Sequence, residues 1–174
     1  NMKRIFLISL FTFSAIISYS QAILPTSWSF TTVNLPNGWT ELGTIFYTAS
    51  GNTPPAMKFD GTGDYLIINV NSTPGDLTYY LTGNGFSGGT FTVEESEFGS
   101  IWNILRIHTS PPNANYLMFT DVPQTTTRFI RFKYTNKVSG NIGLDDVSIN
   151  IGPATPAQEI NLKNASSSLV SGST

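Results

Sequence analysis

The most informative absence in this chain of 174 residues is cysteine, which occurs nowhere in the sequence. Without cysteine no disulfide can form, so the folded state depends on packing or on a bound ion. Charged residues are also scarce, at 11%, and the formal net charge is only -2. Such a chain offers no basic surface to a phosphate backbone, so we expect no nucleic-acid partner.

Helical patterning is a second absence. Beyond the first twenty residues no segment repeats apolar residues at spacings of three and four, so no long amphipathic helix is expected. Apolar residues alternate with polar ones instead, which is typical of half-buried antiparallel strands. In the three clearest segments the inward residues would be Leu66, Ile68 and Val70; Phe91 and Val93; and Ile130, Phe132 and Tyr134.

Turn-forming residues separate these segments at short, nearly regular intervals. The chain has 15 glycines and 10 prolines, and clusters such as LPNGW, NSTPGD and TSPPNAN interrupt the alternation. Many short strands with frequent turns are typical of a sandwich or a barrel. The sequence therefore predicts an all-β fold, an antiparallel jelly-roll β-sandwich of about nine strands, over residues 25–151.

The N-terminal segment has the order of a secretory signal peptide. Lys3 and Arg4 precede an apolar run from Ile5 to Ile17, and small and polar residues follow. The apolar run is shorter than the roughly 20 residues that a membrane-spanning helix needs. We therefore predict a signal peptide over residues 1–20, cleaved near Ser20, and a secreted or cell-surface protein without a membrane span in its mature form.

Several segments resemble one group of exported modules. LPNGWTELG, DYLI, TGNGFSGGTFTVEES and GNIGLDDVSI follow one another over about residues 28–151. In this order they resemble the choice-of-anchor J modules of secreted Bacteroidota proteins, which are related to MAM domains and carbohydrate-binding modules. The resemblance implies a jelly roll in a non-catalytic adhesive or glycan-binding module, often one part of a longer secreted or surface protein.

The C-terminal residues 152–174 have a different composition. PATPAQ is typical of a Pro-rich linker, and EINLKNASSSLVSGST resembles the first strand of an immunoglobulin-like choice-of-anchor D module, although Gln158 stands where proline is usual. The alternative is a disordered Ser-rich tail. The resemblance implies that the chain stops as another module begins, so we expect further domains downstream in the same polypeptide.

Exposed aromatic rings are the first candidates for a ligand site. Carbohydrate modules stack a sugar on an aromatic ring and bind its hydroxyls with polar groups. Trp28 is expected in the core of the sandwich. The candidate ligand-binding residues are Trp39 beside the PNG turn, Trp102 and Tyr80 opposite their apolar neighbours, and Tyr116 after PPNAN.

Catalytic arrangements find little support. His108 is the one imidazole, and the apolar parity of its segment predicts that it faces solvent at a strand end. In VEESE, adjacent strand residues point to opposite faces, so only Glu95 and Glu97 could share one; Glu94 could not join them. A charged strand end leading into a turn is the preferred interpretation, and we predict that the chain is not an enzyme.

The acidic pair in GNIGLDDVSIN marks a change of alternation. Ile142 and Leu144 occupy even positions, whereas Val147 and Ile149 occupy odd ones, so a regular strand could not bury both sets. An extra residue at Asp145 and Asp146, a β-bulge, would restore the inward face. The alternatives there are a hydrogen-bonded bulge and a structural calcium site.

The calcium alternative rests on the same resemblance. In related sandwiches an acidic residue of the last strand, here Asp145 or Asp146, often helps to hold a structural calcium ion with oxygens from the first strand. Thr31 stands where those modules commonly place Glu. That change removes one anionic ligand, so no cofactor is certain and calcium stays an alternative.

Three functions follow from these observations. The favoured one is a non-catalytic exported accessory module that binds a glycan or another cell-surface ligand within a larger protein. The second is a structural or adhesive spacer without a small ligand. The third, disfavoured, is a small glycoside hydrolase, which would need two carboxylates about 5–10 Å apart in a cleft.

Overall fold

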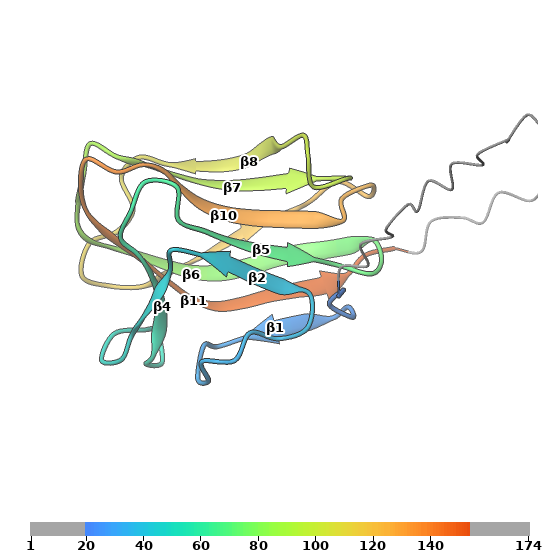
Figure 1. Ribbon diagram of the computed structural model, residues 1–174, viewed down its shortest axis with the longest axis horizontal. Helices are drawn as coiled ribbons and strands as arrows, with labels where there is room; N and C mark the ends of the chain where they lie inside the picture. Colours follow the sequence, from blue (N-terminus) through green and yellow to red (C-terminus); the bar gives the residue numbers. More distant parts are fainter. Residues whose placement is uncertain (1–19, 154–174) are drawn as a thin grey trace, which may run out of the picture.

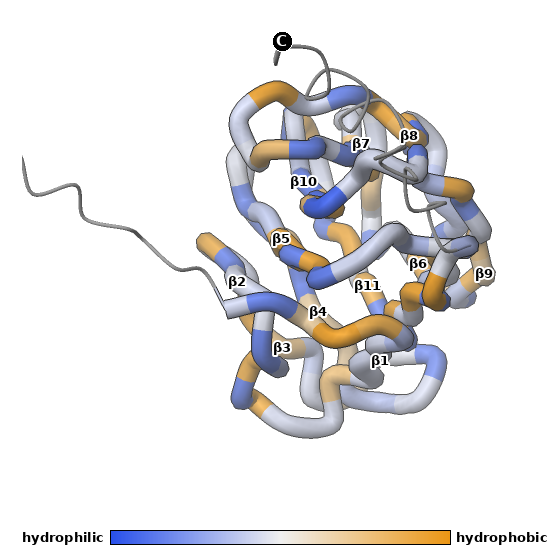
Figure 2. The backbone as a smooth tube through the Cα atoms, turned by 90° about the vertical axis from the view of Figure 1, so that its right-hand side faces the viewer, coloured by the Kyte–Doolittle hydropathy of each residue, from blue (hydrophilic) through white to orange (hydrophobic). Residues whose placement is uncertain are grey.

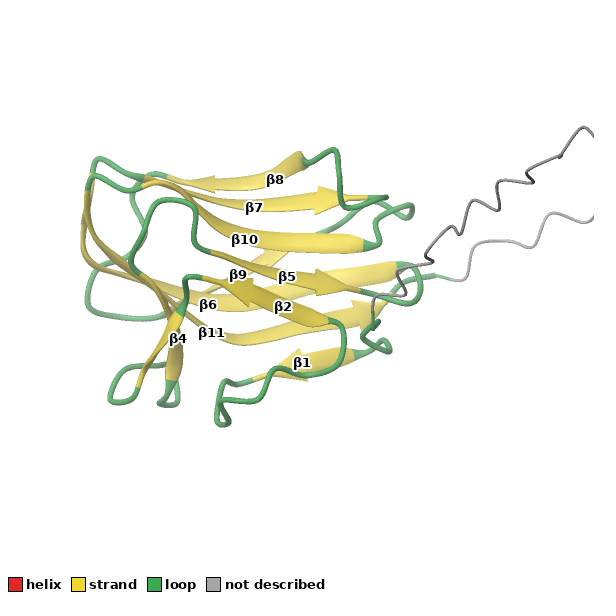
Figure 3. Ribbon diagram, viewed as in Figure 1, coloured by secondary structure: helices red, strands yellow, loops and turns green. Residues whose placement is uncertain are grey.

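The computed structural model describes residues 20–153, and every regular element in that range is a strand (Figures 1 and 3). The signal-peptide prediction for residues before Ser20 and the tail predictions for residues after Pro153 lie outside this range. No helix long and apolar enough to cross a membrane is found among the described residues. The predicted all-β class is confirmed.

The first sheet has six antiparallel strands. The last long strand lies at its centre and pairs with strands from the beginning and middle of the chain. In spatial order the sheet contains β3 (Ile45–Tyr47), β4 (Ala56–Phe59), β11 (Ser139–Ile151), β6 (Pro74–Ser87) and β9 (Leu117–Asp121), and β1 (Thr26–Trp28) pairs with β11 off this path.

The second sheet has five antiparallel strands and packs against the first (Figure 1). Its spatial order is β2 (Trp39–Leu42), β5 (Tyr65–Asn69), β10 (Phe129–Asn136), β7 (Thr90–Ser96) and β8 (Asn103–His108). In both sheets neighbouring strands come from distant parts of the chain. This is the arrangement expected of the predicted jelly-roll sandwich. The eleven strands of the described range exceed the expected nine or so, and β1 and β3 have only three residues each.

The core lies between the two sheets and follows the predicted alternation. Hydrophobic residues are interspersed with hydrophilic ones along the strands (Figure 2), and one parity of each strand points inward. Trp28 is buried in this core, as expected. All the inward residues predicted from the three clearest segments are fully buried: Leu66, Ile68, Val70, Phe91, Val93, Ile130, Phe132 and Tyr134.

The predicted bulge in β11 is present. The pairing of β11 with β6 is regular from Ile142 to Asp145 and shifts before Ser148. Asp146 has a φ of 46°, in the left-handed region, which few non-glycine residues adopt. This bulge keeps both parity sets inward, because Ile142, Leu144, Val147 and Ile149 are all buried.

A second bulge, in β8, overturns one prediction. Val93 pairs with Arg106, but Glu94 pairs with Ile104, so one residue of β8 is left over between them. The extra residue reverses the facing of the strand. His108 consequently lies opposite Phe91 inside the sandwich and is only 6% exposed, so the predicted solvent-facing position is wrong.

Candidate functional site

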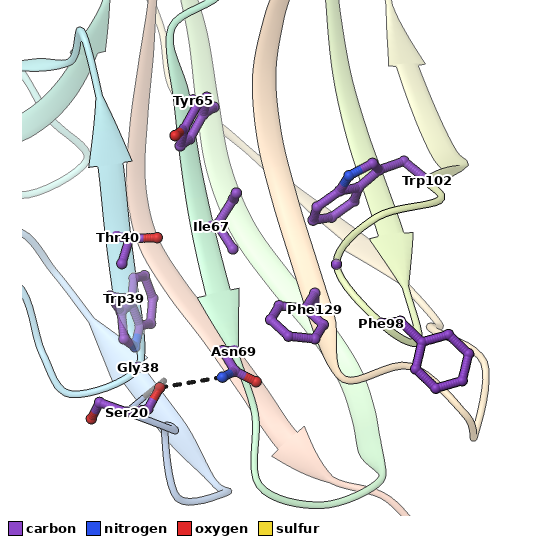
Figure 4. Close-up of a pocket in the computed structure, with 11 residues that line it drawn as sticks. Ser20, Gly38, Trp39, Thr40, Tyr65, Ile67, Asn69, Phe98, Trp102 and Phe129 are labelled. Atoms are coloured by element: carbon purple, nitrogen blue, oxygen red, sulfur yellow. Dashed lines mark hydrogen bonds between the residues drawn. The ribbon is translucent and has the colours of Figure 1, made fainter. Parts of the chain in front are cut away.

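The outer face of the second sheet carries a cleft of about 340 Å³ (Figure 4). Its floor comes from β5, where Tyr65, Ile67 and Asn69 point outward because the intervening residues Leu66 and Ile68 fill the core. Phe129, at the start of β10, pairs with Asn69 and continues the floor. The volume lies within the usual range for a small-ligand pocket.

One wall of the cleft comes from the connection between β7 and β8. Gly99 has a φ of 74°, and its amide donates to Ser96 Oγ at 2.9 Å, which closes a tight turn. The turn places Phe98 and Trp102 beside Phe129 (Figure 4). Phe98 is 75% exposed. Two aromatic side chains of this wall, Phe98 and Trp102, therefore meet a third, Phe129, at the floor.

Trp102 is supported from beneath by a buried ion pair. The guanidinium carbon of Arg131 lies 3.9 Å from the centre of a Trp102 ring, a distance typical of a cation–π contact. Arg131 donates through two nitrogens to Glu94 Oε2. Glu94 also accepts from Thr92 Oγ1 at 2.9 Å. The ring is thus held over β10 and is half-exposed.

Trp39 lines the cleft from the core side. Its ring is only 3% exposed and packs edge-on against Trp28 with centroids 5.6 Å apart. It therefore offers no open ring face, so the predicted stacking platform at Trp39 is not what the structure shows. Its neighbours Gly38 and Thr40 complete this side of the cleft.

Tyr80 and Tyr116 lie on the other sheet. Tyr80 points outward from β6, as its parity predicted, between Met118 of β9 and Asp145 of β11. The Tyr116 hydroxyl lies 3.2 Å from Ser50 Oγ, and burial raises the pKa of Tyr116. The four predicted ligand residues therefore form two separate groups, with only Trp39 and Trp102 at the cleft.

Two buried polar atoms of the cleft have no hydrogen-bond partner in the part of the chain that the structure describes. Asn69 Nδ2 donates to the Ser20 carbonyl at 3.3 Å, but Asn69 Oδ1 has no hydrogen-bond partner within the described residues. The same holds for Trp39 Nε1. Asn69 is 7% exposed, and buried polar groups are normally paired. The sequence signal was a polar residue at the outward parity of the apolar strand DYLIINV.

The cleft continues into a second hollow of about 480 Å³. Asn69, Phe98 and Phe129 line both hollows, so they form the boundary between them. Glu97 and Arg128 line the far part. The two hollows together have room for a ligand longer than one ring.

The acidic pair at the β11 bulge is held by hydrogen bonds. Asp145 is fully buried; its Oδ2 accepts from the Thr53 amide at 3.1 Å, and its Oδ1 accepts from the Asp146 amide at 2.8 Å. Asn52 donates to Asp146 Oδ2 at 2.9 Å. Burial raises the pKa of Asp145 to about 6 in spite of these donors.

This arrangement does not fit a calcium ion well. Amide N–H groups already point at both oxygens of Asp145, whereas a hard cation needs several free oxygens. Among residues 20–153 no group of three or more His, Asp or Glu side chains is placed to hold a metal ion. Asp146 does line a hollow with Ser27, Ser29 and Ser148. Calcium here stays a prediction, which melting temperatures in calcium and in chelator would test.

The glutamates of β7 do not form a paired acid site. Glu94 faces outward to Arg131, whereas Glu95 is buried and accepts from Thr127 Oγ1 at 2.6 Å and from the Gln124 amide at 2.8 Å. Glu94 and Glu95 lie at the end of β7 before a turn, as predicted, but both are buried, whereas Glu97 is exposed. Both buried carboxylates hold neighbouring strands and loops together.

Comparison with known proteins finds solved structures with a similar fold. No family model matches the chain, and no curated protein matches it. The K2 cleaved adhesin domain of Lys-gingipain is similar in structure, with a TM-score of 0.61 and 16% identity over 74% of this chain and 99% of that one. The K1 domain of Lys-gingipain from Porphyromonas gingivalis gives 0.60 and 17%, over 74% and 98%.

A carbohydrate-binding module has the same architecture. A variant of a family 29 carbohydrate binding module gives a TM-score of 0.52 and 17% identity, over 79% of this chain and 93% of that one. Identities this low establish a shared fold and nothing more. The chain therefore has the β-sandwich fold found in adhesin domains and carbohydrate-binding modules.

Proposed function

We propose that this protein is a non-catalytic binding module of an exported or cell-surface protein and that the cleft beside Trp102 binds a glycan. The observation that carries the proposal is the combination of an aromatic wall with the unpaired Asn69 Oδ1 in one hollow. Sugars have both an apolar ring face and polar hydroxyl edges, and such a cleft is complementary to both.

Trp102 has the properties of a stacking residue. Arg131 covers one face of its ring and fixes its position, so little rotational freedom is lost when a ligand stacks on the other face. Phe98 and Phe129 extend the apolar surface toward the second hollow. The length of this surface supports a ligand of several rings.

The comparisons support the same class of function. The similar structures include an adhesin domain and a carbohydrate binding module, and we propose that this chain shares with them a binding role without catalysis. The hydrogen bonds that hold Glu94 and Glu95 agree with this proposal, because neither carboxylate is available as an acid or nucleophile.

The experiment is isothermal titration against soluble polysaccharides that give hits on a glycan array. We expect Trp102→Ala to lower the affinity about tenfold, from the loss of stacking and apolar contact. Tyr80→Ala and Tyr116→Ala are the matched controls on the opposite sheet and should retain binding. Binding that is lost with the two tyrosine variants instead would move the site to the other sheet, and no binding to any polysaccharide would leave the spacer function.

Adhesion to a protein surface is a second candidate, favoured by β8. This edge strand and the turn before it expose Ile101, Ile104 and Ile107 by 77%, 56% and 52%. Exposed apolar residues on an edge strand favour pairing with another strand. Binding to immobilised cell-surface proteins that is lost in Ile104→Lys and retained in Trp102→Ala would identify this function.

A further inference from the structure

Among residues 20–153, no charged side chain lines the cleft beside Trp102. Its walls and floor consist of hydroxyl, amide, aliphatic and aromatic groups, and backbone at two glycines. The lining residues are Ser20, Gly38, Trp39, Thr40, Tyr65, Ile67, Asn69, Phe98, Gly99, Trp102 and Phe129. A ligand in this cleft meets polar atoms but no counter-ion.

The charged side chains near the cleft either form an ion pair with each other or do not line the cleft. Arg131 is covered by Trp102, and its charge is balanced by Glu94. Lys133 points to the same side of the sheet next to Tyr65 but does not line the cleft. The second hollow has one group of each sign, Glu97 and Arg128. An anionic group in the cleft beside Trp102 would therefore lose water without gaining a cation.

The hydrogen bonding of Asn69 also favours an uncharged ligand. Asn69 Oδ1 is an acceptor, and Nδ2 of the same amide donates to the Ser20 carbonyl at the boundary of the predicted signal peptide. In Figure 4 this oxygen lies on the side of Asn69 that faces Phe129. A hydrogen-bond donor on a ligand can pair with it. A hydroxyl or an amide can donate, whereas an ionised carboxylate or sulfate can only accept and would be repelled.

We infer that the cleft selects an uncharged glycan and that a ligand hydroxyl donates to Asn69 Oδ1. The inference rests on the proposed glycan-binding function and names its substrate class: neutral sugar chains are bound, and chains that carry uronic acid or sulfate are rejected. Asn69 is then the residue that determines this selectivity.

Matched polysaccharide pairs test the charge selection. The probes are hydroxyethyl cellulose with carboxymethyl cellulose, dextran with dextran sulfate, and any array hit with its oxidised, uronic-acid form. We expect the neutral member of a bound pair to bind at least about tenfold more tightly and its affinity to change less than about twofold between 0.05 and 0.5 M salt, since an uncharged ligand is not screened.

The outcomes separate the two proposals. Tighter binding of the acidic member, with an affinity that falls as salt is added, would overturn the charge selection and leave glycan binding intact. No binding to either member of any pair, or to any array glycan, would overturn the glycan-binding function itself and the selection with it.

Asn69→Leu tests the proposed contact. Because Asn69 Oδ1 accepts no hydrogen bond from another group of residues 20–153, replacing Asn69 by an apolar residue of similar size should lower the affinity about tenfold while the melting temperature changes little. Asn115→Leu makes the same chemical change at an exposed site outside the cleft and should bind normally. Unchanged affinity in Asn69→Leu would overturn the contact.

Discussion

The hydroxyl oxygen of Tyr79 lies 3.0 Å from Nε2 of His108, and this buried contact joins the two sheets of the sandwich. The hydroxyl also donates to Asp121 Oδ2 at 3.0 Å. Since a phenol has one proton to donate, His108 must donate from Nε2. Arg106 completes the network by donating to Asp121 Oδ1 at 2.8 Å. Two residues of β8 are thereby held to β6 and β9.

The bridging hydroxyl of Tyr79 should stabilise the fold. Tyr79→Phe leaves His108 and Asp121 each without one buried partner, and we expect a loss of about 1–3 kcal/mol in the free energy of unfolding. Urea titration measures it. Tyr80→Phe is the matched control, because the neighbouring ring points outward and lies on the other face of β6; it should change stability by less than about 0.5 kcal/mol. Equal effects of the two changes would contradict the role of the network.

His108 should make the protein sensitive to mild acid. Burial, with a smaller effect of Arg106, lowers the pKa of His108 to about 4, whereas the unfolded chain titrates near 6.5. The folded state therefore resists protonation, and stability present above about pH 6.5 is lost as the pH falls toward 4, by about 3 kcal/mol. His108→Gln keeps a donor to Tyr79 and does not titrate, so its unfolding free energy should fall less over this range. Parallel pH profiles for the two proteins would contradict the prediction.

Asp145 should give the opposite pH dependence. Its folded pKa of about 6 lies above the ordinary value of 3.8, so its contribution is fully present below about pH 3.8 and is lost as the pH rises through 6, by up to about 3 kcal/mol. Asp145→Asn should remove this dependence and also weaken one of the two bonds to Thr53 and Asp146. Asp146→Asn keeps Asp145 and removes only the smaller effect of the neighbouring charge on its pKa, so it is the control and should retain most of the pH dependence.

Alternation predicted the inward residues of the long strands, because burying one face requires a period of two. It also located the bulge at Asp145, since the buried parity changes there. The bulge in β8 left no such signal, because Ile104, Leu105 and Ile107 are apolar at both parities. The position of His108 was therefore beyond the reach of this pattern.

The cleft was predicted less completely than the fold. Trp102 was identified as a candidate, but alternation along a strand does not say which sheet the strand joins, so Tyr80 and Tyr116 could not be separated from it. The role of Asn69 could not be predicted from the strand pattern either, because it depends on β5 lying between β2 and β10. Such contacts between distant segments are set by the topology of the whole sandwich.

Arg131 should hold Trp102 in its stacking position. Arg131→Gln removes the cation beneath the ring and the partner of Glu94, so we expect Trp102 to become more mobile and the glycan affinity to fall about threefold to tenfold. Acrylamide quenching reports on this ring, because Trp28 and Trp39 are buried. Lys133→Gln removes a cation two residues along β10 and should change neither quenching nor the affinity for a neutral glycan.

Gly38 should be required for the position of Asn69. Its carbonyl accepts from the Asn69 amide at 2.8 Å, its φ is 81°, and a Cβ there would overlap the backbone nitrogen of Ala22. Gly38→Ala therefore combines left-handed strain with a backbone clash, and we expect a loss of more than about 3 kcal/mol in the free energy of unfolding. Gly63→Ala separates the two effects, because Gly63 has a φ of 99° and no atom within 4 Å of the added Cβ. Gly63→Ala should lower the free energy of unfolding only through the left-handed strain of its backbone, by about 1–2 kcal/mol. Urea titrations that give equal losses would show that the contact of Gly38 with Ala22 is unimportant.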